Sequence, residues 1–167
     1  SKISCGFISF CTSSKILKAI RLCREENICQ PILLGYEEHI HEKAKKHGVD
    51  ITGVQIINPI TSPQLTKYSE ELYKRRQRKG VNIKEAERLM MDANYFAAMM
   101  IDQGDADGMI NGATTNYPEA VRPIFHTIGL AQNSVPAGMN IILADNRLLF
   151  FADTTVNIDP TAEQLAQ

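Results

Sequence analysis

The side chains best suited to chemistry are concentrated in one stretch, "GDADGMINGATTNYPEAVRP", from Gly104 to Pro123. An apolar segment runs into a loop of small residues, and a proline then begins a helix. Free backbone N–H groups at a helix start, beside the hydroxyl and amide groups of Thr114, Thr115 and Asn116, are typical of an anion site. Arg122 in the second turn adds a guanidinium that can hold a phosphate or carboxylate through two hydrogen bonds.

The same stretch also has an ordinary structural interpretation. Threonine and asparagine before a proline are common capping residues, and Arg122 can pair with Glu119 one turn earlier. Asp105 and Asp107 can cap or solvate the entrance to the segment. The stretch has neither a P-loop lysine nor a GxGxxG motif, so the sequence indicates no standard nucleotide grip.

A second candidate is "YKRRQRKG" at residues 73–80, which carries five cations at the end of an expected helix. Such a cluster suits the helix dipole and is usually solvated. Alternatively, one or two of its arginines turn inward toward a polyanion such as a CoA ester. His126 and the other three histidines are not spaced as metal ligands and are interpreted as surface or packing residues, and methionine at helical spacing is interpreted as core filler.

Composition narrows the classes of protein that fit. The 167 residues are 44% hydrophobic and 22% charged, with a net charge of −1 and a pI near 6.4. A chain without a basic surplus is not expected to bind nucleic acid, and its apolar runs are too short to span a bilayer. Four cysteines without a CxxC pair favour reduced thiols in a cytoplasmic protein. Both ends look cut, which indicates a piece of a longer protein.

Periodicity predicts alternating strands and helices. We expect strands at 3–10, 30–35, 54–58 and 106–112, helices at 13–27, 36–48, 61–80, 83–91, 93–103 and from Pro118 onward, a hairpin of 139–144 with 147–152, and a final helix begun by Asp159 and Pro160. This order predicts an α/β fold built on a doubly wound, mostly parallel sheet, with a small antiparallel hairpin region. Ligands of such sheets lie beyond the carboxyl ends of the strands, where the loop after Asn111 is expected.

Several segments in fixed order resemble the phosphate acetyltransferase and butyryltransferase family: "PILLG", "GVDITGVQIINPITSPQLTKYSEELYKRR", "RKGVNIKEAERLMMDANYFAAMMIDQGDADGMINGA", "RPIFHTIG" and "FADTTVNIDPTAEQLA". The resemblance covers nearly the whole chain. It implies a fold like that of isocitrate and isopropylmalate dehydrogenases, a homodimer, and a cleft that binds CoA and acyl phosphate. Residues 1–167 would form the N-terminal half of a phosphotransacetylase-like domain.

Tyr117-Pro118 is similar to the version of the family found as the C-terminal domain of bacterial NADP-dependent malic enzymes. That resemblance implies a domain that binds acetyl-CoA as an allosteric regulator, with NADP and a divalent metal bound only by an upstream malic enzyme domain that oxidatively decarboxylates malate. It implies no metal or cofactor in this domain. The alternative is a genuine phosphate acetyltransferase that moves acetyl between CoA and phosphate.

The resemblance also assigns residues. Arg76 and Arg122 match family arginines that face the ligand, and Asn111, Thr114, Thr115 and Tyr117 are further candidates for ligand binding. Asn111 stands where transacetylases commonly have serine, and "FCTSS" at 10–14 replaces an acidic turn, so catalysis is in doubt. The family's catalytic Ser-Arg motif lies beyond residue 167, so no catalytic residue is assigned and the fragment alone is expected to be inactive.

Overall fold

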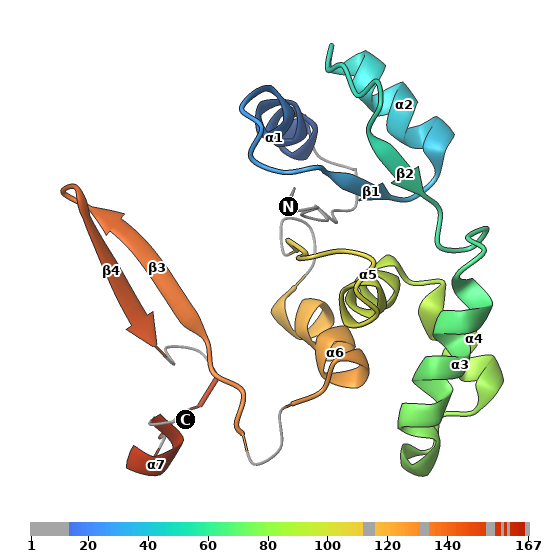
Figure 1. Cartoon of the computed structure of the whole chain (residues 1–167), viewed down its shortest axis with the longest axis vertical. Coiled ribbons are helices and arrows are strands. Elements are labelled where there is room, and N and C mark those ends of the chain that lie inside the picture. Colours follow the sequence, from blue (N-terminus) through green and yellow to red (C-terminus); the bar gives the residue numbers. More distant parts are fainter. Residues whose placement is uncertain are drawn as a thin grey trace. The chain divides into compact units, whose positions relative to one another are not determined.

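The computed structural model describes residues 14–111, 116–130, 134–152, 156–157, 159 and 161–165. The chain forms two compact units, Ser1–Ile128 and Gly129–Gln167. Figure 1 labels their helices and strands. Each unit is described by itself below.

A short parallel sheet organises the first part of unit 1. Helix α1 (Ser14–Glu25) leads to β1 (Ile32–Leu34), and helix α2 (Glu37–Lys46) connects β1 to β2 (Gln55–Ile57). The strands pair in parallel, with Ile32 opposite Gln55 and Leu34 opposite Ile57. Helix α2 carries two glutamates in its first turn and three lysines in its last, which complements the helix dipole.

Strand β1 is buried on both faces and joins two hydrophobic cores. Leu33 packs with the apolar residues of α1 and α2, whereas Ile32 and Leu34 belong to the core formed by the later helices. Successive side chains of a strand point to opposite faces, so three consecutive apolar residues can serve both cores. This arrangement supports the α/β class expected from the sequence.

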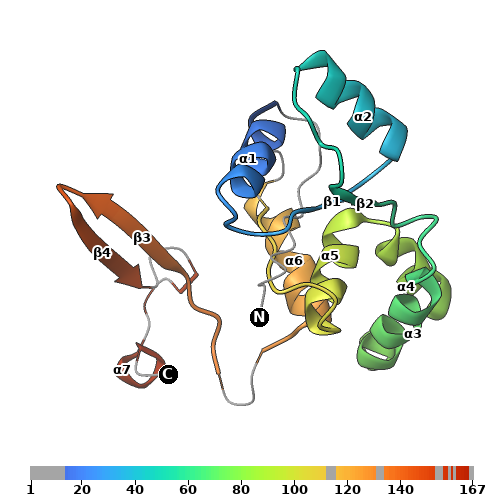
Figure 2. The same cartoon turned by 45° about the horizontal axis from the view of Figure 1, so that its top comes forward.

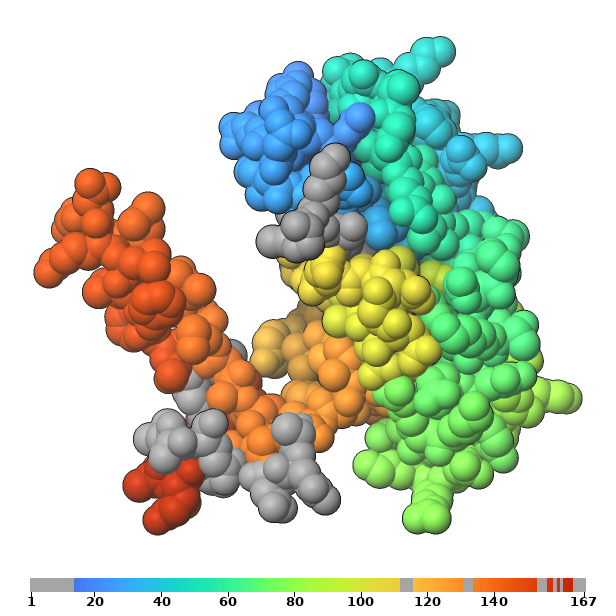
Figure 3. Space-filling model, in the orientation of Figure 1, coloured from blue at the N-terminus to red at the C-terminus, as the bar shows by residue number. Residues whose placement is uncertain are grey.

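The later helices pack around a central, almost fully buried helix. They are α3 (Leu65–Arg76) with the 3₁₀ turn η1 (Gln77–Lys79), α4 (Ile83–Met90), α5 (Ala93–Asp102) and α6 (Tyr117–Thr127). Residues 93–100 of α5 are all buried, as expected of a helix that is apolar on every side. Figure 2 shows α5 beside α6, with α3 and α4 adjacent to each other. On the face drawn in Figure 3, the green and yellow segments form one continuous packed body.

Helices α4, α5 and α6 each begin at a side-chain cap. Asn82, Asp92 and Asn116 accept hydrogen bonds from backbone N–H groups in the first turns of the three helices. Such caps stabilise a helix by about 1 kcal/mol each. Asp92 was expected to cap its helix, and the structure confirms it. The cap also fixes Tyr95, whose N–H it accepts at 3.3 Å, in the first turn of α5.

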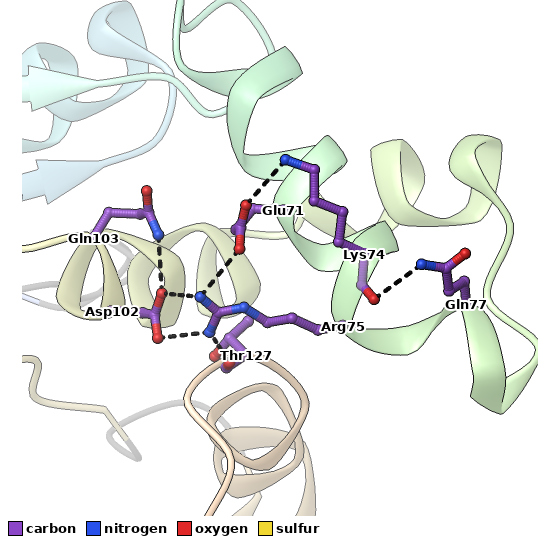
Figure 4. A network of polar contacts seen from close by, with 7 residues as sticks. All are labelled: Glu71, Lys74, Arg75, Gln77, Asp102, Gln103 and Thr127. Carbon is purple, nitrogen blue, oxygen red and sulfur yellow. Dashed lines mark hydrogen bonds and ion pairs between the residues drawn. The ribbon is translucent and has the colours of Figure 1, made fainter.

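Arg75 joins three helices at one point (Figure 4). Its Nη1 and Nη2 donate to the two carboxylate oxygens of Asp102 on α5 at 2.6 and 2.7 Å. Nη1 also donates to the carbonyl oxygen of Thr127 on α6 at 2.6 Å. Glu71, one turn earlier on α3, lies 3.4 Å from Nη2. The pKa of the Asp102 carboxyl is held below its usual range, mainly by the hydrogen bond from Arg75.

Unit 2 contains an antiparallel hairpin and a short helix. Strands β3 (Met139–Ala144) and β4 (Arg147–Ala152) pair so that Met139 faces Ala152 and Ala144 faces Arg147. Asp145 and Asn146 at the turn have φ of 47° and 62°, which are the positive values that a type I′ turn requires. Helix α7 (Ala162–Leu165) follows.

The α/β class, the hairpin and most predicted elements are confirmed, with three differences. Helix α3 begins at Leu65, later than expected, because the Ser62 side chain accepts from the Gln64 N–H and supports a turn before the helix. Helix α7 begins at Ala162, also later than expected. The expected strand at 106–112 is absent from its described part, where no neighbouring strand pairs with it. The strand expected at 3–10 lies outside the described residues. The doubly wound sheet and the dehydrogenase likeness stay predictions.

We expect Arg75→Met to lower the free energy of unfolding of the intact protein by roughly 1–3 kcal/mol, because it removes two charge-assisted hydrogen bonds from the partly buried Asp102 carboxylate and one from the carbonyl oxygen of Thr127. Water screens part of this interaction, since the Arg75 side chain is 31% exposed. Urea unfolding measures the change. Arg88→Met, which breaks the exposed Arg88–Glu85 pair, is the matched control and should leave stability unchanged. Equal effects of the two substitutions would contradict the role of Arg75.

Candidate anion site

Four basic side chains of unit 1 gather where the end of α3 meets α6. Arg76 ends α3, Lys79 lies in η1, and Arg122 and His126 lie on α6. The charges of Arg76, Arg122 and Lys79 all lower the pKa of the His126 imidazole, after the larger effect of burial. We call Arg76, Lys79, Arg122 and His126 the basic cluster.

Local sequence explains how the cluster is assembled. Arg122 and His126 are four residues apart on α6 and therefore share one face of the helix. Consecutive helical residues point about 100° apart, so Arg76 cannot face the same way as Arg75. Gly80 has φ of 88°, a left-handed conformation that suits glycine, and it ends η1 directly after Lys79.

Among the described residues, the arginines of the cluster lack the acidic partners that Arg21, Arg75 and Arg88 have. Arg75 and Arg88 each form a close ion pair, with Asp102 and Glu85. Within the described residues, neither Arg76 nor Arg122 forms an ion pair, and Arg122 does not pair with Glu119. The Nε atom of Arg76 is buried and has no hydrogen-bond partner there. Buried polar groups are nearly always hydrogen-bonded, so this nitrogen is an exception that needs a partner.

A tyrosine holds the histidine of the cluster. The Tyr95 hydroxyl lies 2.8 Å from Nδ1 of His126, and the two rings are tilted by 54° with centroids 5.8 Å apart. Tyr95 is only 7% exposed, so its position is set by the packing of α5. Burial raises the pKa of the Tyr95 hydroxyl, which keeps it protonated.

Two asparagines lie at the same end of α5. The side-chain amide of Asn111 donates a hydrogen bond to the side-chain oxygen of Asn94, which is 7% exposed. Asn94 directly precedes Tyr95 in the first turn of α5. Asn111, a residue predicted to bind ligand, is therefore tied to the element that positions His126.

The other predicted residues have different outcomes. Thr114 and Thr115 lie outside the described residues. Asn116 accepts from the N–H of Glu119 at 3.1 Å and caps α6, as the structural interpretation expected. Tyr117 is 54% exposed and lies about half a turn around α6 from His126, so the structure does not bring it to the cluster. The ligand-binding roles of these residues stay predictions.

Sequence reasoning missed two members of this arrangement. His126 was interpreted as a surface or packing residue, and Tyr95 was not singled out. Lys79 was one of the five cations of the candidate at 73–80, where only arginines were expected to turn inward. The four-residue spacing of Arg122 and His126 was a usable signal, because it places both on one helix face. Nothing in the sequence could reveal that Tyr95, on another helix, reaches the imidazole.

Cavities elsewhere in unit 1 are less suited to anions. One of about 510 Å³ is lined by residues that include Glu37, Asp105 and Tyr68, and none of the described residues that line it is basic. Tyr68 donates a hydrogen bond to the Asp105 carboxylate there. A second, of about 530 Å³, has Arg24 and Asp105 among its lining residues. Carboxylates repel phosphates, so the basic cluster is the better candidate.

The chemistry that the cluster can perform is anion binding and charge stabilisation. Guanidinium and ammonium groups hold phosphates, and the imidazole can donate or accept a proton. In the part of the chain that the structure describes, no group of three His, Cys, Asp or Glu side chains is placed to hold a metal ion. No described helix is both long enough and apolar enough to cross a bilayer.

Comparison with known proteins decides the family. The model of the phosphate acetyl/butaryl transferase family matches residues 9–167. The chain belongs to this family. The phosphate acetyltransferase of Corynebacterium glutamicum is 35% identical over 154 residues, which cover 92% of the chain and 47% of that protein. The NADP-dependent malic enzyme of Rhizobium meliloti is 40% identical over 138 residues, which cover 81% of the chain and 18% of that enzyme.

Solved structures of the family have the same fold. A phosphotransacetylase from Streptococcus pyogenes matches with a TM-score of 0.88 and 27% identity, over 98% of this chain and 50% of that one. A phosphotransacetylase from Staphylococcus aureus matches with a TM-score of 0.86. The chain spans half or less of the length of the relatives named here. The resemblance stated from the sequence is thus confirmed, both to phosphate acetyltransferases and to malic enzymes.

The arrangement of the basic cluster predicts the pKa of His126, whatever the function of the protein. We expect the pKa of His126 in the intact protein to lie below the ordinary value of 6.5, and Arg76→Gln or Arg122→Gln to raise it by removing a like charge. NMR titration of the imidazole measures the pKa. Arg21→Gln on α1, whose partner is Glu25, is the control and should leave it unchanged. An unshifted pKa in both cluster variants would show that these charges do not surround His126.

Proposed function

We propose that the basic cluster binds a phosphate group of a CoA ester. The observation that carries the proposal is the pairing state of the arginines: Arg76 and Arg122 have no acidic partner within the described residues, and Arg76 Nε is buried and unsatisfied. Guanidinium groups hold phosphate through paired N–H donors. A CoA ester carries several phosphates, and the family is one of acyl-CoA chemistry.

We propose that this chain is a regulatory domain of an NADP-dependent malic enzyme. In this role the domain binds acetyl-CoA as an allosteric signal. Tyr117-Pro118 and the 40% identity to the Rhizobium meliloti enzyme support it. In this role the cluster needs to bind the ester without cleaving it. An allosteric role needs an ester that binds one state of the enzyme more tightly than another, and we propose that the described arginines contribute to that binding.

The second candidate is a phosphate acetyltransferase. The 35% identity to the Corynebacterium glutamicum enzyme, over more of the chain, favours it to a similar degree. Here a CoA thiolate would attack the acetyl carbon of acetyl phosphate, the bond from that carbon to the phosphate oxygen would break, and phosphate would leave. The basic cluster would hold the anionic groups and stabilise the developing charge.

The binding proposal is tested with two conservative substitutions. We expect Arg76→Gln and Arg122→Gln each to weaken acetyl-CoA binding to the intact protein about 10- to 100-fold, because each removes a charge-assisted contact of roughly 1.5–3 kcal/mol. Isothermal titration calorimetry measures the dissociation constant. Arg88→Gln, which alters an exposed arginine already paired with Glu85, is the control. Wild-type affinity in both cluster variants would place the ligand elsewhere.

The two candidate functions predict different rates. If the chain is a regulatory domain, acetyl-CoA should change malate-dependent NADP reduction by the intact protein, and Arg122→Gln should shift this response to higher acetyl-CoA concentration. If it is a transferase, the intact protein should form acetyl phosphate from acetyl-CoA and phosphate. Malate-dependent activity that acetyl-CoA leaves unchanged would reject the regulatory role.

A further inference from the structure

His126 has one ring nitrogen fixed by the protein and one that is not. Nδ1 lies 2.8 Å from the Tyr95 hydroxyl, and no other hydrogen bond or ion pair of His126 occurs among the described residues. The side chain is half-buried, and its neighbour four residues earlier, Arg122, is exposed. The other nitrogen, Nε2, has no partner among the described residues. Its ring is held in place beside arginines that have no acidic partner there.

The charges around the imidazole are one-sided. Arg76 from α3, Lys79 from η1 and Arg122 from α6 all act on His126. The element packed against its ring, α5, contributes the uncharged Tyr95, whereas Asp92 and Glu85 act on the tyrosine. Burial and these three cations lower the pKa of His126, so the ring is neutral near pH 7 in the free protein.

An anion bound at the cluster reverses this electrostatic situation. Its negative charge offsets the three cations and favours the imidazolium form, so the pKa of His126 rises when the ligand binds. Linkage then requires that binding takes up a proton at pH values between the lowered pKa of the free protein and the raised pKa of the complex. Within that window, affinity falls as pH rises, by at most about tenfold per pH unit.

Tyrosine is a suitable partner for a histidine that changes its charge. The neutral ring can accept at Nδ1 from the Tyr95 hydroxyl, with its proton on Nε2. When a proton from solvent is added at Nδ1, that nitrogen becomes a donor and the same hydroxyl becomes the acceptor. The hydrogen bond survives both states, and Nε2–H remains a donor throughout.

We propose that His126 contacts the ligand, donating from Nε2 to a phosphate oxygen, and that binding of a CoA ester is coupled to uptake of a proton by the His126 imidazole. This inference rests on the proposed CoA-ester site. The site then contains His126, which titrates, in addition to two arginines, which stay charged. The affinity of the site thereby becomes sensitive to pH in the physiological range.

Calorimetry in two buffers of different ionisation enthalpy tests the coupling, because it counts the protons taken up when acetyl-CoA binds to the intact protein. A phosphate monoester itself titrates near pH 6, so the informative quantity is the difference between wild type and His126→Gln. Glutamine keeps a hydrogen-bonding side chain but cannot titrate. We expect wild type to take up more protons than the variant at pH 6–7. The affinity gap between the two proteins should widen as pH falls from 8 to 6.

His39→Gln, on the distant helix α2, is the matched control and should behave as wild type. A second readout needs no variant at this position: NMR titration should place the His126 pKa higher in the acetyl-CoA complex than in the free protein. Equal proton uptake by wild type and His126→Gln, together with an unshifted His126 pKa, would overturn the inference while leaving the CoA-ester site intact. Failure of wild type to bind acetyl-CoA would instead reject the proposed function and this inference together.

Discussion

The guanidinium of Arg75 joins the ends of three helices, α3, α5 and α6, and the candidate site lies beside that junction. It binds both carboxylate oxygens of Asp102 on α5 and the last-turn carbonyl oxygen of Thr127 on α6. Apolar packing alone tolerates small slides between helices, whereas three directional hydrogen bonds from one planar group allow few relative positions. Because Asp102 is only 14% exposed, losing the arginine would leave a carboxylate largely shielded from water.

The neighbouring arginine is placed by the same constraint but is used differently. Arg76 points about 100° away from Arg75 around α3, toward the face where Arg122 and His126 of α6 lie. The junction at Arg75 and Thr127 thus sets the distance between two helices whose other side chains form the basic cluster. One arginine satisfies its charge inside the protein, and the next has a buried Nε without a partner. Because Arg75 holds the helices together, Arg76 is left available to bind a ligand.

Local patterns were enough to predict most elements. Apolar periodicity and capping residues indicate helices α1 to α6, and the Asp145-Asn146 turn indicates the β3–β4 hairpin. The segment after Asp105 was predicted wrongly as a strand, since an apolar run reveals nothing about whether a partner strand is present. Arg122 was named first from its place in the second turn of the helix after the expected anion loop, and the resemblance to the family then singled out both Arg76 and Arg122. The pairing of Tyr95 with His126 could not be predicted, because residues 31 positions apart meet only through the packing of α5 on α6.

We propose that phosphate is recognised by the basic cluster and not by the loop before α6 alone. The most direct test is a crystal structure of the intact protein with bound acetyl-CoA. We expect a ligand phosphate within hydrogen-bond distance of Arg76 and Arg122, with Nε2 of His126 facing the same phosphate. A ligand whose phosphates all lie away from these three residues, with Arg76 Nε still unpaired, would contradict it.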